Sequence, residues 1–311
     1  IVSASKDFDL GQTAKGLVTK KAQETSTALR FLFTSLADMI HSLREAERKL
    51  HVQATRDSLT GLPNRALLLD RINQAIARQQ RHAAKLAVFF IDLNKFKFIN
   101  DSLGHAAGDL VLQEMARRLQ ALSRGEDTVA RLGGDEFVLT YELSSNDVVE
   151  LLGQRVVTAL GQPMQLFGTS YTLGGSVGIA LYPEHGDSAE ALLKHADIAM
   201  YQAKKHSDYP LRVFDEGMQQ VINERLQMEA RLRRGIAEGE LLLHYQPQVD
   251  FRTGTLVGLE ALVRWNSPDY GFLGPGRFIP LAEESSLIDS IDNYVLDAAC
   301  AQIKAWHASG Q

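Results

Sequence analysis

Apolar residues divide the first part of the chain from the rest by their spacing. From Leu29 they recur at alternating intervals of three and four, the a/d rhythm of a coiled coil. The positions are Leu29, Leu32, Leu36, Met39, Leu43, Ala46 and Leu50. The charged flank from Arg44 to Lys49 suits a solvated two-helix rod, and a single amphipathic helix packed on its own domain is the alternative.

The pattern after this helix predicts an alternating α/β order. A nearly continuous apolar run at residues 86–93 has the length of a strand covered on both faces. Two further strands flank the tetrapeptide Gly133 to Glu136 and predict a β-hairpin. Helices are expected at about 67–77, 105–122, 146–160 and 188–205, with a strand at 211–214. One sheet with helices on its faces is the expected arrangement.

A second domain is predicted beyond this sheet. A helical stretch at 218–238 leads to a new hairpin, LLLHYQPQV and TLVGLEALVRW, and then to one or two helices. The predicted organisation is a signalling helix at residues 1–56, an α/β (α+β) domain at 57–216, a linker helix at 217–239 and the second domain at 240–311.

Composition excludes several functional classes. The net charge of −5 argues against a broad basic surface for nucleic acid. No apolar run reaches the roughly 18 residues of a membrane span, so the chain is expected to be soluble. The single cysteine, Cys300, excludes an internal disulfide, and its apolar-periodic helix predicts a buried thiol.

Three carboxylates form the candidate catalytic centre. Asp92 ends the apolar strand, and Asp135 and Glu136 occupy the hairpin tip, so pairing of the two strands would bring them to one sheet edge. Each acid alone is more typical of a solvated turn. Gly133 and Gly134 permit positive φ and close approach of a phosphate. Hard oxygen ligands of this kind suit Mg²⁺, which also bridges substrate phosphates.

The segment after Asp92 supplies further groups for a nucleotide. Lys97 is suited to neutralise phosphate charge, and Asn100 and Asp109 offer an amide and a carboxylate for the edge of a guanine. Capping of the helix that begins near His105 is the alternative for the last two. The chain has no G-x-x-x-x-G-K-[ST] motif, so it is not a P-loop enzyme.

Five ordered strings resemble the GGDEF diguanylate cyclase family across about residues 57–214. They are DSLTGLPNR, DLNKFKFINDSLGHAAGD, RLGGDEF, SVGIALYP and ADIAMYQAK. The resemblance implies a nucleotidyl-cyclase or polymerase-palm sheet flanked by helices. It also implies condensation of two GTP into cyclic di-GMP with release of pyrophosphate.

The resemblance implies a role for each matching residue. Asp92 and Asp135, with the Leu93 carbonyl, would bind Mg²⁺ or Mn²⁺. Glu136 would be a further ligand or help deprotonate the ribose 3′-hydroxyl. Lys97 and Lys204 would hold phosphates, and Asn100 and Asp109 the guanine.

The resemblance also implies dimerisation and feedback. Two GTP-loaded domains must face each other, so a homodimer through the N-terminal helix is expected. Arg124 and Asp127 form an R-x-x-D that matches the family's inhibitory site for cyclic di-GMP, and a surface salt bridge is the alternative. Asp208 stands where the family usually has a phosphate-binding arginine, and Lys205 or Arg212 is a candidate replacement. The departure leaves open a catalytically weak GTP-sensing or cyclic di-GMP-binding module that regulates a phosphodiesterase.

The C-terminal part resembles the start of an EAL phosphodiesterase domain, which is TIM-barrel-like. The matching strings are HYQPQV, GLEALVRW and FIPLAEESSLI. By position Glu260 would be a metal ligand, and Gln246 and Arg264 would contact the dinucleotide. We expect a fragment of a longer GGDEF-EAL protein that does not itself hydrolyse cyclic di-GMP. A faint similarity of residues 6–10 to the end of a HAMP linker suggests a cytoplasmic part of an inner-membrane sensor.

Overall fold

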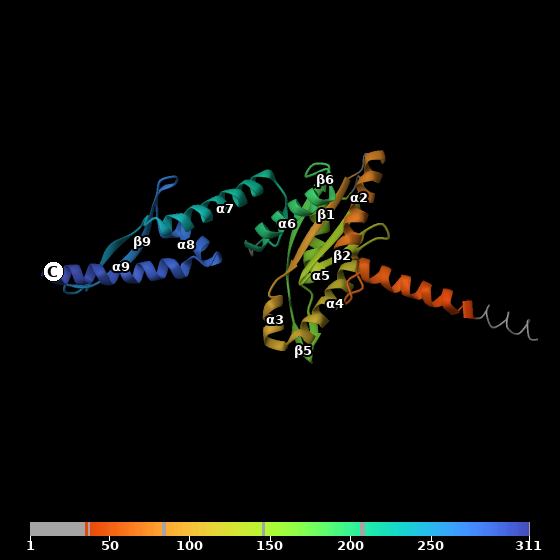
Figure 1. The fold of residues 1–311 in the computed structure, drawn as a ribbon, viewed down its shortest axis with the longest axis horizontal. Coiled ribbons are helices and arrows are strands. Elements are labelled where there is room, and N and C mark those ends of the chain that lie inside the picture. The colour runs from red at the N-terminus through yellow and green to blue at the C-terminus, as the bar shows by residue number, and fades with distance from the viewer. Residues whose placement is uncertain (1–34, 37, 83–84, 145–146, 206–208, 311) are drawn as a thin grey trace, which may run out of the picture. The chain divides into compact units, whose positions relative to one another are not determined.

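The computed structural model describes residues 35–36, 38–82, 85–144, 147–205 and 209–310. It divides into two compact units, residues 1–214 and 215–311 (Figure 1). The expected coiled-coil positions Leu29 and Leu32, the HAMP-like segment and Asp208 lie outside the described residues.

The N-terminal helix, residues 38–55, precedes the first sheet. Its apolar positions are open to solvent in the single chain, with Met39 65%, Leu43 68% and Leu50 66% exposed. A partner helix is the kind of surface that would cover such a stripe.

The first unit is one mixed sheet with helices on both faces (Figure 1). The strand order is β2-β3-β1-β6-β7, and every pairing is antiparallel except that of β6 with β7. A separate hairpin is formed by β4 and β5. The elements are α2 (Arg65–His82), β1 (Lys85–Leu93), α3 (Phe96–Leu103), α4 (His105–Leu122), β2 (Thr128–Gly133), β3 (Glu136–Leu143), α5 (Val149–Leu160), β4 (Met164–Leu166), β5 (Thr169–Tyr171), β6 (Gly175–Tyr182), α6 (Ala189–Lys205) and β7 (Leu211–Val213).

Alternation along the central strand β1 builds a core on each face of the sheet. Phe89 and Ile91 pack with α3, α4 and α5 on one face. Val88 and Phe90 pack with α2 and α6 on the other. The uninterrupted apolar run is thus explained by burial on both faces, as expected. The same alternation directs Asp92 toward the α2 and α6 face.

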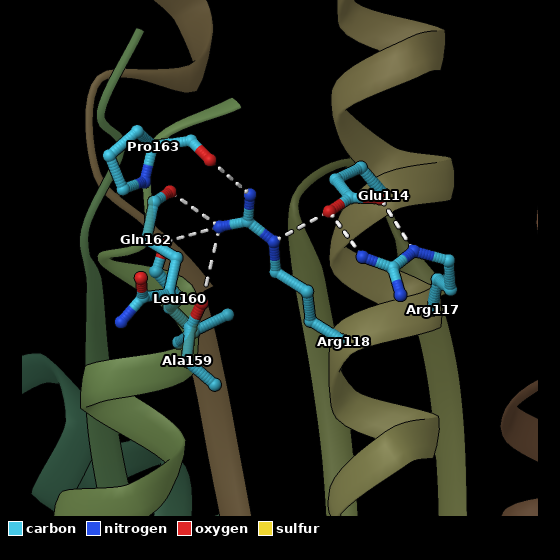
Figure 2. A network of polar contacts seen from close by, with 7 residues as sticks. All are labelled: Glu114, Arg117, Arg118, Ala159, Leu160, Gln162 and Pro163. Carbon is cyan, nitrogen blue, oxygen red and sulfur yellow. Dashed lines mark hydrogen bonds and ion pairs between the residues drawn. The ribbon is translucent and has the colours of Figure 1, made fainter. Parts of the chain in front are cut away.

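Helices α4 and α5 are joined by a buried guanidinium, that of Arg118, which is 8% exposed (Figure 2). Its Nε donates to Glu114 at 2.8 Å, and Glu114 also pairs with Arg117. Its other nitrogens donate to the carbonyls of Ala159, Leu160, Gln162 and Pro163. The last carbonyls of a helix have no partner within it and carry partial negative charge, so a cation here caps α5.

The second unit has its own core around Trp265 and Phe278, both fully buried. Its elements are α7 (Glu216–Ala237), β8 (Leu241–Val249), β9 (Leu256–Ser267), β10 (Gly271–Leu273), α8 (Pro275–Glu284) and α9 (Ile288–Ala308), with strand order β10-β9-β8. Leu232 of α7 is buried in this core, so the C-terminal half of that helix belongs to the second unit.

The expectation of a buried Cys300 is wrong, because the residue is exposed. Among the described residues of α9 only Ile291 is buried, and near the end of the helix Trp306 contacts Tyr245 of β8. An apolar periodicity predicts which face of a helix can be buried, but another element must cover that face.

Candidate functional site

The three predicted carboxylates meet at one edge of the first sheet. Asp92 is directly opposite Glu136 in the antiparallel register of β1 and β3. Directly paired residues point to the same face, so both side chains lie on the α6 side. The backbone of Leu93 donates to the Asp135 carbonyl at 3.3 Å, which holds the hairpin turn beside the end of β1.

The hairpin turn depends on Gly133 and Gly134. Gly134 has φ of 49° and Gly133 has φ of 151°, conformations that residues with a β-carbon rarely adopt. A β-carbon at either glycine would meet no atom within 4 Å, so the backbone of the turn is open to a ligand.

An ion pair that sequence reasoning missed, between Arg131 of β2 and Asp57 outside the hairpin, holds the turn in place. Arg131 donates through Nε and Nη2 to the Gly134 carbonyl, at 3.1 and 2.8 Å. Its Nη1 lies 2.9 Å from Asp57 Oδ2. Burial alone would raise the pKa of Asp57, but hydrogen bonds from Thr60 and Arg131 hold that pKa below its ordinary value. Asp57 is therefore an anion fixed to the turn.

Helix α6 contributes a cation to the site. Lys204 Nζ lies 2.6 Å from Asp92 Oδ1, and the Asp92 side chain is only 10% exposed. Burial raises the pKa of Asp92, the bond to Lys204 lowers it, and the nearby charge of Asp135 raises it again. The buried carboxylate thus needs a positive neighbour, and Lys204 supplies one.

A fourth acid on α6, Asp197, was not singled out from the sequence. Burial raises the pKa of Glu136, and the charges of Asp197, Asp92 and Asp135 raise it further. Sequence spacing gave no signal for Asp197, because its proximity to β3 depends on how α6 packs.

The donor set fits a divalent cation that is shared with a substrate. Within the described residues, no group of three or more His, Cys, Asp or Glu side chains is arranged to hold a metal ion. Mg²⁺ does not require such a cage, because it commonly takes one or two carboxylates and completes its shell with water and substrate phosphates. Asp92 and Asp135, with a main-chain carbonyl such as that of Leu93, match that mode.

The two residues predicted to bind guanine lie on consecutive helices, Asn100 on α3 and Asp109 on α4. The Asn100 Oδ1 atom is buried and has no hydrogen-bond partner in the described part of the chain. Gly108 makes room for it, since a β-carbon there would lie 2.0 Å from Oδ1. Asp109 and Lys97 are exposed. Helix α4 follows Gly104 with no described side chain capping it, so these residues are not helix caps.

The R-x-x-D residues are neighbours without a side-chain pair. Asp127 Oδ2 accepts from the backbone nitrogen of Arg124 at 2.6 Å. The Arg124 guanidinium instead faces Asp147 at 3.4 Å and stays 61% exposed. Burial raises the pKa of Asp127, although the backbone hydrogen bond from Arg124 lowers it.

The predicted residues of the second unit share one face of its sheet. Gln246 of β8 is paired with Glu260 of β9, and both are exposed. Arg264 lies four residues further along β9, so its side chain points to the same face.

Comparison with known proteins agrees with this architecture. A family model described as "Diguanylate cyclase, GGDEF domain" matches residues 54–209, and one described as "EAL domain" matches residues 229–311. No helix in the described part of the chain is both long and apolar enough to cross a membrane.

Two curated relatives come from Pseudomonas aeruginosa. The bifunctional diguanylate cyclase/cyclic di-GMP phosphodiesterase MucR is 43% identical over 269 residues, covering 86% of this chain and 39% of MucR. The cyclic di-GMP phosphodiesterase NbdA is 38% identical over 272 residues, covering 88% of this chain and 35% of NbdA. The chain therefore spans about two fifths or less of these relatives.

Among solved structures, the GGDEF domain of TpbB (YfiN) from the same organism superposes with a TM-score of 0.52 at 41% identity. It covers 54% of this chain and 99% of that domain.

Proposed function

The chain belongs to the GGDEF diguanylate cyclase family, and from this premise we propose that its first unit condenses two GTP into cyclic di-GMP. One observation carries the proposal. The register of β1 and β3 sets Asp92 opposite Glu136, beside the glycine turn and the ammonium of Lys204. Acids, an open turn and a cation at one sheet edge are what positioning of a triphosphate requires.

The chain's own groups would divide the work of binding. The unpaired Asn100 amide oxygen and the Asp109 carboxylate accept N–H groups of guanine. Lys97 and Lys204 neutralise phosphate oxygens, and the Gly133–Gly134 turn lets the triphosphate approach the main chain. Asp92, Asp135, Glu136 and the Leu93 carbonyl are the candidate ligands of Mg²⁺ or Mn²⁺. When bound, the ion supplies charge neutralisation at the phosphates.

In the reaction the 3′-oxygen of one GTP bonds to the α-phosphorus of the other. The bond from that phosphorus to the pyrophosphate oxygen breaks, and the hydroxyl proton passes to Glu136 or to water. The product forms when each GTP has acted once as nucleophile and once as electrophile, with two pyrophosphates released.

Two copies of the chain must meet for this chemistry, because each chain has one such site, in its first unit. A parallel pair of N-terminal helices would cover the exposed stripe of Met39, Leu43 and Leu50 and bring the two sites together. Because GTP is an intracellular substrate, we place the unit in the cytoplasm, and a membrane sensor upstream in the parent protein is compatible with this placement.

Product would act back on the enzyme at Arg124 and Asp127. The Arg124 guanidinium is exposed and its contact with Asp147 is long, so a ligand phosphate or guanine edge can replace that partner.

A second candidate is a regulatory unit that binds GTP or cyclic di-GMP and controls a phosphodiesterase. NbdA, which matches most of this chain, is named only as a phosphodiesterase. Asp208 also stands where the family usually has a phosphate-binding arginine.

The decisive experiment incubates the chain with GTP and Mg²⁺ and detects cyclic di-GMP by mass. We expect product from the wild-type chain and none from an Asp135→Ala, Glu136→Ala double variant. GTP binding without product in the wild type would overturn the cyclase proposal and favour the regulatory one.

A further inference from the structure

Asn64 forms two hydrogen bonds with the end of the N-terminal helix. Its backbone nitrogen donates to the Thr55 carbonyl at 2.9 Å, and its side-chain nitrogen donates to the Ala54 carbonyl at 2.8 Å. Its side-chain oxygen accepts from Leu67 at the start of α2. The last turn of the helix therefore cannot move without moving the loop at residues 56–64.

This loop is in turn fastened to strand β2. The Pro63 carbonyl accepts from the backbone nitrogen of Arg131 at 3.0 Å. Leu62 is fully buried in the core, and Asp57 accepts from both the backbone and the hydroxyl of Thr60. The Asp57 carboxylate is thus held in one position, with both of its oxygens within 3.0 Å of Arg131 Nη1.

The opposite edge of the same guanidinium holds the glycine turn. Arg131 Nε and Nη2 both donate to the Gly134 carbonyl, and the next carbonyl, that of Asp135, accepts from Leu93. The Arg131 side chain is 10% exposed and that of Asp57 19% exposed, so water competes little for the bonds between these two side chains. The bonds to the Gly134 carbonyl lie at the solvent-exposed side of the guanidinium. A planar guanidinium can bind two partners at fixed angles, which an ammonium cannot do.

We infer that Arg131 is the positioning residue of the catalytic turn, and that its ion pair with Asp57 couples the turn to the end of the N-terminal helix. The inference rests on the proposed function for its catalytic consequence only. Movement of the helix end would shift the loop, and Arg131 would carry that shift to the Gly134 carbonyl and hence to Asp135. The position of the helix end would thus regulate the site through a continuous series of hydrogen-bonded contacts from Thr55 to Asp135.

The test uses the full chain with Asp57→Asn, Asp57→Glu and Arg131→Lys, and with Lys85→Gln as the matched control. Lys85 also forms an ion pair across the sheet, with Glu184, but at the other end of β1. Two quantities are measured: steady-state cyclase kinetics with GTP and Mg²⁺, and amide hydrogen exchange by NMR without nucleotide. Thermal unfolding of each variant verifies that it is folded.

We expect Asp57→Asn and Arg131→Lys to lower kcat about tenfold or more while KM for GTP changes less than about threefold, because positioning, not binding, is lost. Asp57→Glu should recover part of kcat. The Leu93 amide, which binds the Asp135 carbonyl, should exchange faster in Asp57→Asn. The Arg56 amide, which binds the helix carbonyl of Val52, should exchange faster in Arg131→Lys, because coupling is reciprocal. The control Lys85→Gln should change neither kcat nor the exchange rates of these two amides.

The inference would be overturned if the Leu93 amide exchanged at its wild-type rate in Asp57→Asn and the Arg56 amide exchanged at its wild-type rate in Arg131→Lys. So would a folded Arg131→Lys variant with wild-type kcat. If the wild-type chain makes no cyclic di-GMP, the proposed function fails, while the exchange comparison still decides whether the ion pair couples helix and turn.

Discussion

The ammonium of Lys204 lies 2.6 Å from Oδ1 of Asp92 and joins helix α6 to the end of strand β1. A carboxylate that is 10% exposed among other acids is thereby neutralised by a residue of the chain itself. A divalent cation at the same carboxylate would compete with this lysine, or release it toward a phosphate.

Replacing this lysine should therefore make the fold depend on the metal. Lys204→Met leaves Asp92 unpaired, so we expect the free energy of unfolding without metal to fall by about 1–3 kcal/mol. Millimolar Mg²⁺ should raise the free energy of unfolding of the variant more than that of the wild type, because in the variant the cation takes the place of the ammonium. Thermal unfolding with and without MgCl₂ measures both effects. An equal response to Mg²⁺ in variant and wild type would contradict competition at Asp92.

A methyl group at Gly108 should act on nucleotide binding and leave the fold intact. The β-carbon of Gly108→Ala would lie 2.0 Å from Asn100 Oδ1, the far end of a side chain that can rotate away. The reorientation removes the guanine acceptor, so KM for GTP should rise about tenfold, while the free energy of unfolding changes by less than about 1 kcal/mol.

The control for this variant is Gly276→Ala in α8, where a β-carbon meets no atom within 4 Å. That control should keep the wild-type KM. An unchanged KM in Gly108→Ala would separate Asn100 from nucleotide binding.

The same substitution at Gly178 should strongly destabilise the first unit. Here a β-carbon would lie 2.0 Å from the Met200 nitrogen and 2.1 Å from the Ala196 carbonyl oxygen, both backbone atoms of α6. No rotamer change relieves that overlap, so α6 must separate from β6. We expect Gly178→Ala to lower the free energy of unfolding by about 3 kcal/mol or more, measured by urea denaturation. A loss below about 1 kcal/mol would show that α6 shifts easily.

The local sequence pattern was sufficient to predict strand β1 and the glycine turn, the elements that position the site's acids. The run at residues 86–93 is apolar because β1 is covered on both faces, and the two glycines require a turn, so the positions of Asp92 and Asp135 followed from adjacent sequence. The family-like order of the strings also predicted the fold class correctly.

Long-range partners were not predictable in the same way. Asp57 and Arg131 are 74 residues apart, and Lys204 is 112 residues from Asp92, so no spacing rule connects them. Helix α3 was missed because its eight residues include only two buried ones, too few to produce a clear helical periodicity. The roles assigned to Lys97, Asn100, Asp109, Arg124 and Asp127 stay predictions.

The acid dependence of stability should be set in part by Glu114. Its hydrogen bonds to Arg117, together with those to Arg118, outweigh burial and lower its pKa from 4.5 to about 2. A depressed acid pKa stabilises the folded state above the unfolded pKa, and that stabilisation is lost as pH falls from about 5 toward 2. The full shift corresponds to about 3 kcal/mol, and we expect about 2 kcal/mol because Arg117 is largely solvated.

Glu114→Gln should therefore be less stable than the wild type by about 2 kcal/mol at pH 7, and the two free energies of urea unfolding should converge near pH 2–3. Arg117→Gln serves as the control, since it keeps the Glu114–Arg118 pair, in which Arg118 is buried, and should lose much less stability at pH 7 than Glu114→Gln. A gap between Glu114→Gln and the wild type that stays constant from pH 7 to 3 would mean that the carboxylate's charge does not hold Arg118 against α5.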